Sequence, residues 1–154
     1  MHQHPKQYLK DGLVVDNSWQ LVAADVETLP TGDILVPVAY WQANQQQLAD
    51  HSGNVGVWVD GHEEVEEFAS SIATVPVIAI NFLKFVDGRG FSMARLLRER
   101  FGYIGEIRAI GDVLRDQLFA LRRCGFDAFA LREDKDPLDA LKAFDDFSEV
   151  YQAS

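Results

Sequence analysis

The sequence predicts one α/β domain over residues 1–154, in which an N-terminal hairpin is followed by about five βα units and a mostly parallel sheet. Three observations lead to this class. The chain has 154 residues, of which 47% are hydrophobic and 25% charged, as is usual for one globular domain. From Asp33 onward, apolar runs alternate with helical stretches. These runs are apolar almost throughout, which is typical of strands buried on both faces of a parallel sheet.

The first segment, residues 1–32, is expected to hold the hairpin. Residues 12–15 and 19–22 are rich in β-forming side chains, and they flank Asp16-Asn17-Ser18. Aspartate, asparagine and serine tolerate tight turns, so this tripeptide is the expected turn of the hairpin.

The second segment, residues 33–154, is expected to alternate strands with helices. The predicted strands cover residues 34–38, 55–59, 75–80, 107–110 and 126–131. Helical spacing of apolar residues predicts helices over residues 41–50, 63–72, 93–101 and 113–123, with a last helix beginning at Asp136-Pro137. Gly102 and Gly125 follow two of these helices, where a left-handed residue commonly ends a helix.

About five units are too few for a closed eight-stranded barrel. The sequence therefore leaves two architectures open, a partial TIM-barrel-like sheet and an open flavodoxin-like sheet. A partial barrel exposes a sheet edge, and a homodimer is the expected way to cover it.

Charge is unevenly distributed along the chain. The net charge of −10 argues against nucleic-acid binding, since phosphate backbones select basic surfaces. The net charge is −9 over residues 1–83, +4 over residues 84–132 and −5 over residues 133–154, and the middle part holds all nine arginines. Such a concentration suits a small anion or an acidic partner surface. The alternative is that these arginines lie on exposed helix faces and pair with neighbouring acids.

Several site classes are excluded by simple counts. The single cysteine, Cys124, cannot form an internal disulfide or hold a cysteine-ligated cluster, and no histidines stand at metal-ligand spacing, so no metal site is expected. No apolar run of the sequence approaches the ~20 residues of a membrane span. No signal sequence is recognisable at the N-terminus, so we expect a cytoplasmic protein without membrane contact.

Ligands of parallel sheets bind beyond the carboxyl ends of the strands, where this sequence places a series of polar residues. They are Asp60, Asn81, Lys84, Asp112, Arg132, Glu133 and Asp134. Two of them have structural alternatives, because Asp112 is positioned to cap a helix at Val113 and Asp60 precedes Gly61 in a possible turn.

The connection from Asn81 to Ser92 is the strongest local feature, because its glycines flank an arginine just before a predicted helix. With Ser92 as N-cap, the helix start is expected to bind a small anion. The predicted ligand-binding residues are Asn81, Lys84, Asp87, Gly88, Arg89, Gly90, Ser92, Arg115 and Arg132. The alternative is a glycine turn with solvated charges. A dinucleotide fingerprint is rejected, because Met93 stands where a third small residue is needed.

Asp112 and Asp116 are the candidate catalytic residues. They stand four residues apart, on one helix face if the helix begins early, and Arg115 lies between them. Two carboxylates beside a guanidinium can transfer protons at a bound anion. A helix cap with an exposed ion pair is the structural alternative.

Several sequence blocks together resemble a bacterial domain-of-unknown-function family, number 934, over nearly the whole chain. These blocks are residues 34–38 with Trp41, 87–92, 94–100, 111–117, 123–129, 146–148 and 151–152. That family is typically encoded beside the sulfite reductase haemoprotein and phosphoadenylyl-sulfate reductase, and it is labelled an oxidoreductase involved in sulfite reduction. The resemblance implies a cytoplasmic accessory protein of sulfur assimilation, and it supplies no catalytic residue and no cofactor. With one cysteine, a redox role would need a partner's cofactor or a ligand site of a kind that the sequence does not reveal.

Two functions follow as expectations. The first is an accessory protein or oxidoreductase of sulfate and sulfite reduction that holds a small oxyanion or phosphorylated ligand at the strand ends. The second is a non-catalytic partner of sulfite reductase, which docks through the arginine-rich helices over residues 93–100 and 115–123.

Overall fold

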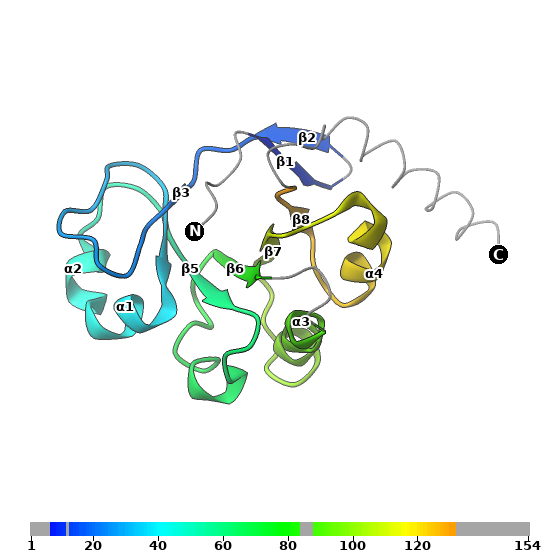
Figure 1. The fold of residues 1–154 in the computed structure, drawn as a ribbon. Coiled ribbons are helices and arrows are strands. Elements are labelled where there is room, and N and C mark those ends of the chain that lie inside the picture. The colour runs from blue at the N-terminus through cyan, green and yellow to red at the C-terminus, as the bar shows by residue number, and fades with distance from the viewer. Residues whose placement is uncertain (1–6, 12, 84–87, 132–154) are drawn as a thin grey trace.

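A computed structural model describes residues 7–11, 13–83 and 88–131, and it shows one eight-stranded sheet curled into a half-barrel (Figure 1). The strands are β1 (Gln7–Lys10), β2 (Leu13–Asp16), β3 (Gln20–Leu21), β4 (Ile34–Pro37), β5 (Val55–Asp60), β6 (Val77–Phe82), β7 (Glu106–Gly111) and β8 (Ala128–Phe129). The helices are α1 (Val38–Ala43), α2 (Gln45–Ala49), α3 (Arg89–Glu99) and α4 (Leu118–Arg123), with 3₁₀ turns η1 (Val65–Glu67) and η2 (Arg115–Gln117).

The strand order across the sheet is β2-β1-β8-β7-β6-β5-β4-β3. Strands β3 to β8 are parallel neighbours in chain order, whereas β1 is antiparallel to both β2 and β8. The sheet is therefore mixed, and the α/β class is confirmed. The flavodoxin-like alternative is wrong, because such a sheet reverses its strand order at a switch point and this one does not.

The predicted hairpin is wrong in its position. The hairpin is β1 with β2, and its turn contains Asp11 at φ 54°. Asp16 instead ends β2, and Asn17-Ser18 opens a connection that leads across the open side of the half-barrel to β3, at the opposite edge (Figure 1). There β3 pairs parallel with β4.

The five predicted strands of the second segment match β4 to β8, whereas the helices differ more. Residues 41–50 form two short helices separated at Asn44, and residues 63–72 hold only η1 followed by turns. Helix α3 begins four residues earlier than predicted. Both glycine ends are confirmed, since Gly102 and Gly125 have φ values of +66° and +114°. The helix predicted from Asp136 lies outside the described residues.

The two faces of the sheet bury different layers. The outer face packs against the helices, and its Ile78 and Ile80 share one buried cluster with Leu97 of α3 (Figure 1). The inner, concave face buries a smaller cluster that includes Leu35, Trp58 and Ala79. Within the part of the chain that the structure describes, no helix has the length and apolar character of a membrane span.

Candidate functional site

Asp60 and Asn81 lie side by side where β5 and β6 end. The two residues are register partners, and the Asn81 amide Nδ2 donates a 2.8 Å hydrogen bond to the Asp60 carboxylate. Both side chains are half-buried. The sequence therefore predicted correctly that polar groups meet at the carboxyl edge of this sheet, as parallel strands require.

Asp60 also begins a tight turn, as its structural interpretation predicted. The backbone N–H of Glu63 donates to the Asp60 carbonyl at 3.0 Å, and the backbone N–H of Asp60 donates to Glu63 Oε2 at 2.7 Å. These two hydrogen bonds hold residues 61–64 at the end of β5. The loop is thereby positioned next to α3.

The next strand brings Asp112 to the same edge. Its backbone N–H donates to the Phe82 carbonyl at 2.8 Å. The preceding Gly111 has φ +86°, and a Cβ there would come within 2.2 Å of Asn81 Oδ1, so only glycine fits. Asp60, Asn81 and Asp112 thus follow one another along the rim.

Helix α3 begins at Arg89 with Gly88 as its N-cap, so the prediction that Ser92 is the N-cap is wrong. Ser92 lies in the first turns, and its N–H donates to the Gly88 carbonyl at 3.2 Å. The helix begins earlier because Gly90 can pack closely there. A Cβ on Gly90 would meet the Phe82 ring at 2.5 Å, and one on Gly61 would meet Gly90 Cα at 3.1 Å.

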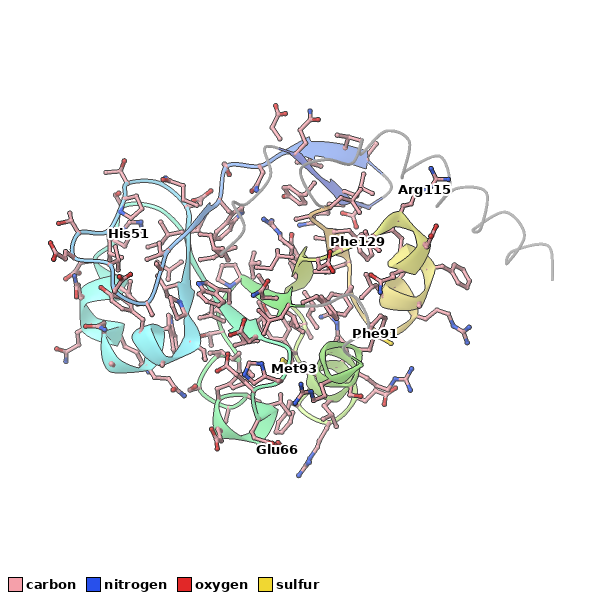
Figure 2. All side chains as sticks on the ribbon, in the orientation of Figure 1. His51, Glu66, Phe91, Met93, Arg115 and Phe129 are labelled. Carbon is pink, nitrogen blue, oxygen red and sulfur yellow. The ribbon has the colours of Figure 1, made fainter. Side chains whose placement is uncertain are left out.

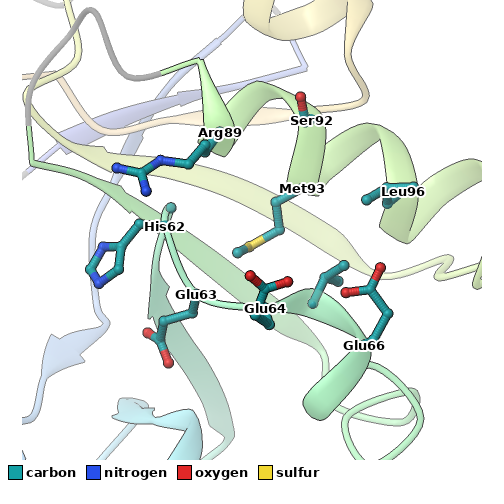
Figure 3. A pocket seen from close by; sticks show the side chains of 10 residues that line it. His62, Glu63, Glu64, Glu66, Arg89, Ser92, Met93 and Leu96 are labelled. Atoms are coloured by element: carbon teal, nitrogen blue, oxygen red, sulfur yellow. The ribbon is translucent and has the colours of Figure 1, made fainter.

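This close packing leaves a pocket of about 170 Å³ between the loop after β5 and α3 (Figure 3). Its floor consists of the buried Gly61, Val65 and Met93. Exposed polar residues form the walls. They are His62, Glu63, Glu64, Glu66, Arg89 and Ser92.

The polar walls differ in charge. Arg89 lies on the α3 side above His62, whereas the glutamates come from the opposite loop (Figure 3). Glu63 accepts the Asp60 N–H, and Glu66 forms a 3.3 Å ion pair with Arg100. Arg89 can bind an anionic group of a ligand, and Glu64 can accept a hydrogen bond from a hydroxyl of the same ligand.

The predicted catalytic pair is not assembled as expected. Asp112 precedes an extended Leu114, η2 starts at Arg115 and α4 starts only at Leu118, so Asp112 and Asp116 do not share a helix face. The same geometry rules out Asp112 as the cap of a helix at Val113. Neither aspartate lines the pocket.

Arg115 is also separate from the pocket, beside α4 and well apart from Met93 and Glu66 (Figure 2). Of the predicted ligand-binding residues, the structure brings Arg89 and Ser92 to the pocket, with Gly90 just behind its floor and Gly88 at the helix start. The candidates Lys84, Asp87, Arg132, Glu133 and Asp134 lie outside the described residues.

The acidic wall of the pocket, His62 to Glu66, was not predicted from the sequence, because residues 63–72 were expected to form an amphipathic helix. The missed signal is Asp60-Gly61-His62-Glu63, which combines a turn glycine with an acid three residues after another acid. Over residues 7–11, 13–83 and 88–131, no group of three metal-ligating side chains gathers.

The arginine-rich helices lie side by side. Arg95 on α3 approaches Cys124 at the end of α4, with 3.7 Å between Nη2 and Sγ. Arg95, Arg122 and Arg123 are exposed, whereas Arg98 is half-buried and bonded to backbone carbonyls. The cationic surface of α3 and α4 therefore excludes Arg98, which the docking hypothesis had included.

A comparison with protein-family models matches residues 56–154, from β5 to the last residue, to the family described as "Bacterial protein of unknown function (DUF934)". The match includes every residue of the pocket. The comparison with curated proteins gives no match.

Proposed function

The chain belongs to the bacterial family of unknown function DUF934, and we propose that it is an accessory protein of assimilatory sulfate and sulfite reduction. In this proposal it binds a small oxyanion or phosphorylated ligand in the pocket beside Arg89. The sulfur context is supported by the gene neighbourhood of the family it resembles. The ligand class is supported by the pocket itself.

The main support for oxyanion binding is the position of Arg89, which lies over a small pocket at the carboxyl ends of β5 and β6. A guanidinium offers two parallel N–H donors to an oxyanion, which is the geometry that sulfate and phosphate groups prefer. His62 stands beside it as a second donor (Figure 3). The floor of Val65 and Met93 excludes water below the ligand, which strengthens these bonds.

The acidic wall narrows the ligand class further. Glu63 and Glu64 repel a bare dianion, so the favoured ligand carries hydroxyl or other donor groups besides its anionic group. Protonated sulfite satisfies this requirement, as does the ribose of an adenylylated sulfate. At about 170 Å³ the pocket accommodates the oxyanion, and a nucleotide would extend over the rim.

Isothermal titration with sulfite, sulfate and adenylylated sulfates tests this proposal. We expect the wild type to bind sulfite and adenylylated sulfates more tightly than sulfate, which carries no donor group. Arg89→Ala is expected to weaken this binding about tenfold or more, the scale of a charge-assisted hydrogen bond. Arg123→Ala is the matched control, because it removes the same charge from α4, away from the pocket. Absence of heat with all three ligands, or equal affinities of Arg89→Ala and wild type, contradicts the proposal.

A second candidate function is docking on sulfite reductase, and the cationic surface of Arg95, Arg122 and Arg123 favours it. Three exposed guanidinium groups on adjoining helices present a positive patch on a protein whose net charge is −10. Such a patch increases the rate of association with an acidic surface and makes it sensitive to salt.

A pull-down with the sulfite reductase haemoprotein distinguishes docking from ligand binding. Reversing Arg95, Arg122 and Arg123 to glutamate is expected to abolish salt-sensitive capture, whereas Arg89→Ala is expected to retain it. Capture that survives both high salt and the triple reversal contradicts docking through this surface.

A further inference from the structure

A fully buried arginine lies on the inner face of the half-barrel, remote from the pocket beside Arg89. Arg108 belongs to β7, and its side chain has 0% exposure. Its neighbours across the two adjacent strands are Ala79 and Ala128, which are also buried. These small side chains leave the space above the centre of the sheet to the guanidinium.

The guanidinium is held on two sides. Its Nε donates to Glu106 Oε2 at 2.8 Å, and Nη1 donates to Asn17 Oδ1 at 3.3 Å. The Tyr8 ring lies over it at 3.9 Å from its centroid, and the Trp19 ring lies at 5.9 Å. Nη2 is buried and has no hydrogen-bond partner in the described structure. Leaving the donors of a charged group unsatisfied is costly, so this atom indicates a missing acceptor.

The charges around Arg108 do not balance. Glu106 also accepts an ion pair from Lys10, at 2.7 Å to its other oxygen, and only 6% of the Glu106 side chain is exposed. The hydrogen bond to Glu106 raises the pKa of Lys10, so the ammonium is charged at neutral pH. Among the described residues, Glu106 is the carboxylate in direct contact with both cations, and these three side chains together carry a net charge of +1. An uncompensated charge within a sheet of low dielectric attracts a counter-ion.

We propose that the inner face of the half-barrel binds one small inorganic oxyanion, which accepts hydrogen bonds from Arg108 Nη2 beneath Asn17 and Trp19. The ligand class follows from the donor, because a guanidinium with a free edge is suited to sulfate, sulfite or phosphate oxygens. Asn17 and Trp19 belong to the connection from β2 to β3 and are half-buried, so displacement of this connection admits the anion. This site shares no residue with the pocket beside Arg89 and does not depend on its function.

Thermal unfolding and tryptophan fluorescence of the full chain test the proposal. Sodium sulfate, sulfite and phosphate are titrated at millimolar concentration against sodium chloride of equal ionic strength, which controls for general salt effects. Each oxyanion that binds is expected to raise the midpoint of unfolding and to change the emission of Trp19. For a given anion, both measurements should give the same Kd. The emission change is expected to disappear in Trp19→Phe. No difference from chloride for any of the three anions overturns the proposal.

Three variants identify the site. Arg108→Lys keeps the charge but loses the forked donors, and it is expected to weaken the Kd about tenfold or more. Glu106→Gln removes the competing negative charge and is expected to tighten binding, an effect that a purely structural cluster would not give. Lys10→Met removes one cation from the partly exposed edge of the cluster and is expected to weaken binding of the anion. This variant tests the proposal even if Arg108→Lys does not fold.

Two controls separate this site from others. Arg95→Lys makes the same substitution at an exposed position and is expected to keep the wild-type Kd. Arg89→Ala is expected to keep the Trp19 response even if it abolishes binding in the other pocket. Equal Kd values in wild type, Glu106→Gln and Lys10→Met place the anion elsewhere and overturn the proposal.

Discussion

Arg98 on α3 donates a 3.0 Å hydrogen bond from its Nε to the carbonyl of Gly125, just after α4 ends. Its Nη1 also donates to the carbonyls of Tyr103 and Gly105, at 2.9 Å and 2.7 Å. One side chain thus joins the ends of two helices to the start of β7. These carbonyls lack partners within a helix or strand at those positions, so the arginine completes their hydrogen bonding.

Arg98→Met is expected to lower the free energy of unfolding by about 3 kcal/mol, because it removes several charge-assisted hydrogen bonds while preserving the apolar stem. Urea unfolding followed by circular dichroism measures this change. Arg95→Met, an exposed position on the same helix, is the control and should change stability by less than about 0.5 kcal/mol. Equal effects of the two substitutions would show that the Arg98 contacts contribute nothing.

Gly125→Ala is expected to destabilise the protein more than Gly102→Ala. Both glycines have positive φ, which costs an alanine about 1 kcal/mol or more. Only at Gly125 would the new Cβ also meet a neighbour, Arg98 Cγ at 2.6 Å, whereas nothing lies within 4 Å at Gly102. The difference between the two unfolding free energies isolates this clash, and a difference of zero would contradict it.

Asn81→Asp places a second carboxylate against Asp60, where the wild-type amide donates a hydrogen bond. We expect a loss of about 1–2 kcal/mol at neutral pH, because a hydrogen bond is replaced by repulsion between half-buried charges. The loss should shrink on acidification, since protonation of one carboxyl restores a donor. Asn81→Ala loses the bond without adding charge, so its cost should vary less over the same pH range than that of Asn81→Asp. Parallel pH profiles of the two variants would contradict the prediction.

Asp127 is expected to make the folded protein less stable as pH rises, the opposite of the usual effect of an acidic side chain. Burial raises the pKa of its carboxyl above 3.8, although the Ile107 N–H and the Arg98 guanidinium oppose this shift. The folded protein then holds the proton more tightly than the unfolded chain. The resulting stabilisation is complete below pH 3.8 and is lost as pH rises through the raised folded pKa.

Asp127→Asn removes this titration and keeps an acceptor for Ile107. The unfolding free energy of wild type minus that of Asp127→Asn is therefore expected to decrease as pH rises from about 3 to about 7. Urea unfolding at several pH values measures it, and other carboxyl groups cancel in the difference. A difference that rises with pH would mean that the Arg98 ion pair outweighs burial.

The strands of the second segment could be predicted from the sequence because burial on both faces leaves uninterrupted apolar runs, as in Ile78 and Ile80. The position of the hairpin could not be predicted, because Asp11-Gly12 and Asp16-Asn17-Ser18 are both sequences that favour turns. What selects the first is the pairing of Leu9 with Phe129, a contact between distant parts of the chain that local patterns do not reveal.

The candidate site was predictable to a similar extent. Asp60 and Asn81 follow from the rule that parallel strands end at one edge. The absence of a helix over residues 63–72 could not be predicted. The apolar spacing of this stretch fits a helix, but η1 and the following turns also bury Phe68 and Ile72. The burial of arginines was the hardest feature to predict from the sequence. Arg98 and Arg108 are expected to be exposed unless the groups that accept their hydrogen bonds are known.

The pairing of β1 with β8 also sets an order of events during synthesis. Leu9 leaves the ribosome early, yet its partner Phe129 is made only after every other described strand. The β1–β8 pair therefore cannot form until Phe129 has been made, and until then this edge of the hairpin stays unpaired. Closure between such distant segments is slow, so the final step of folding is expected to be the capture of β8 by this waiting edge.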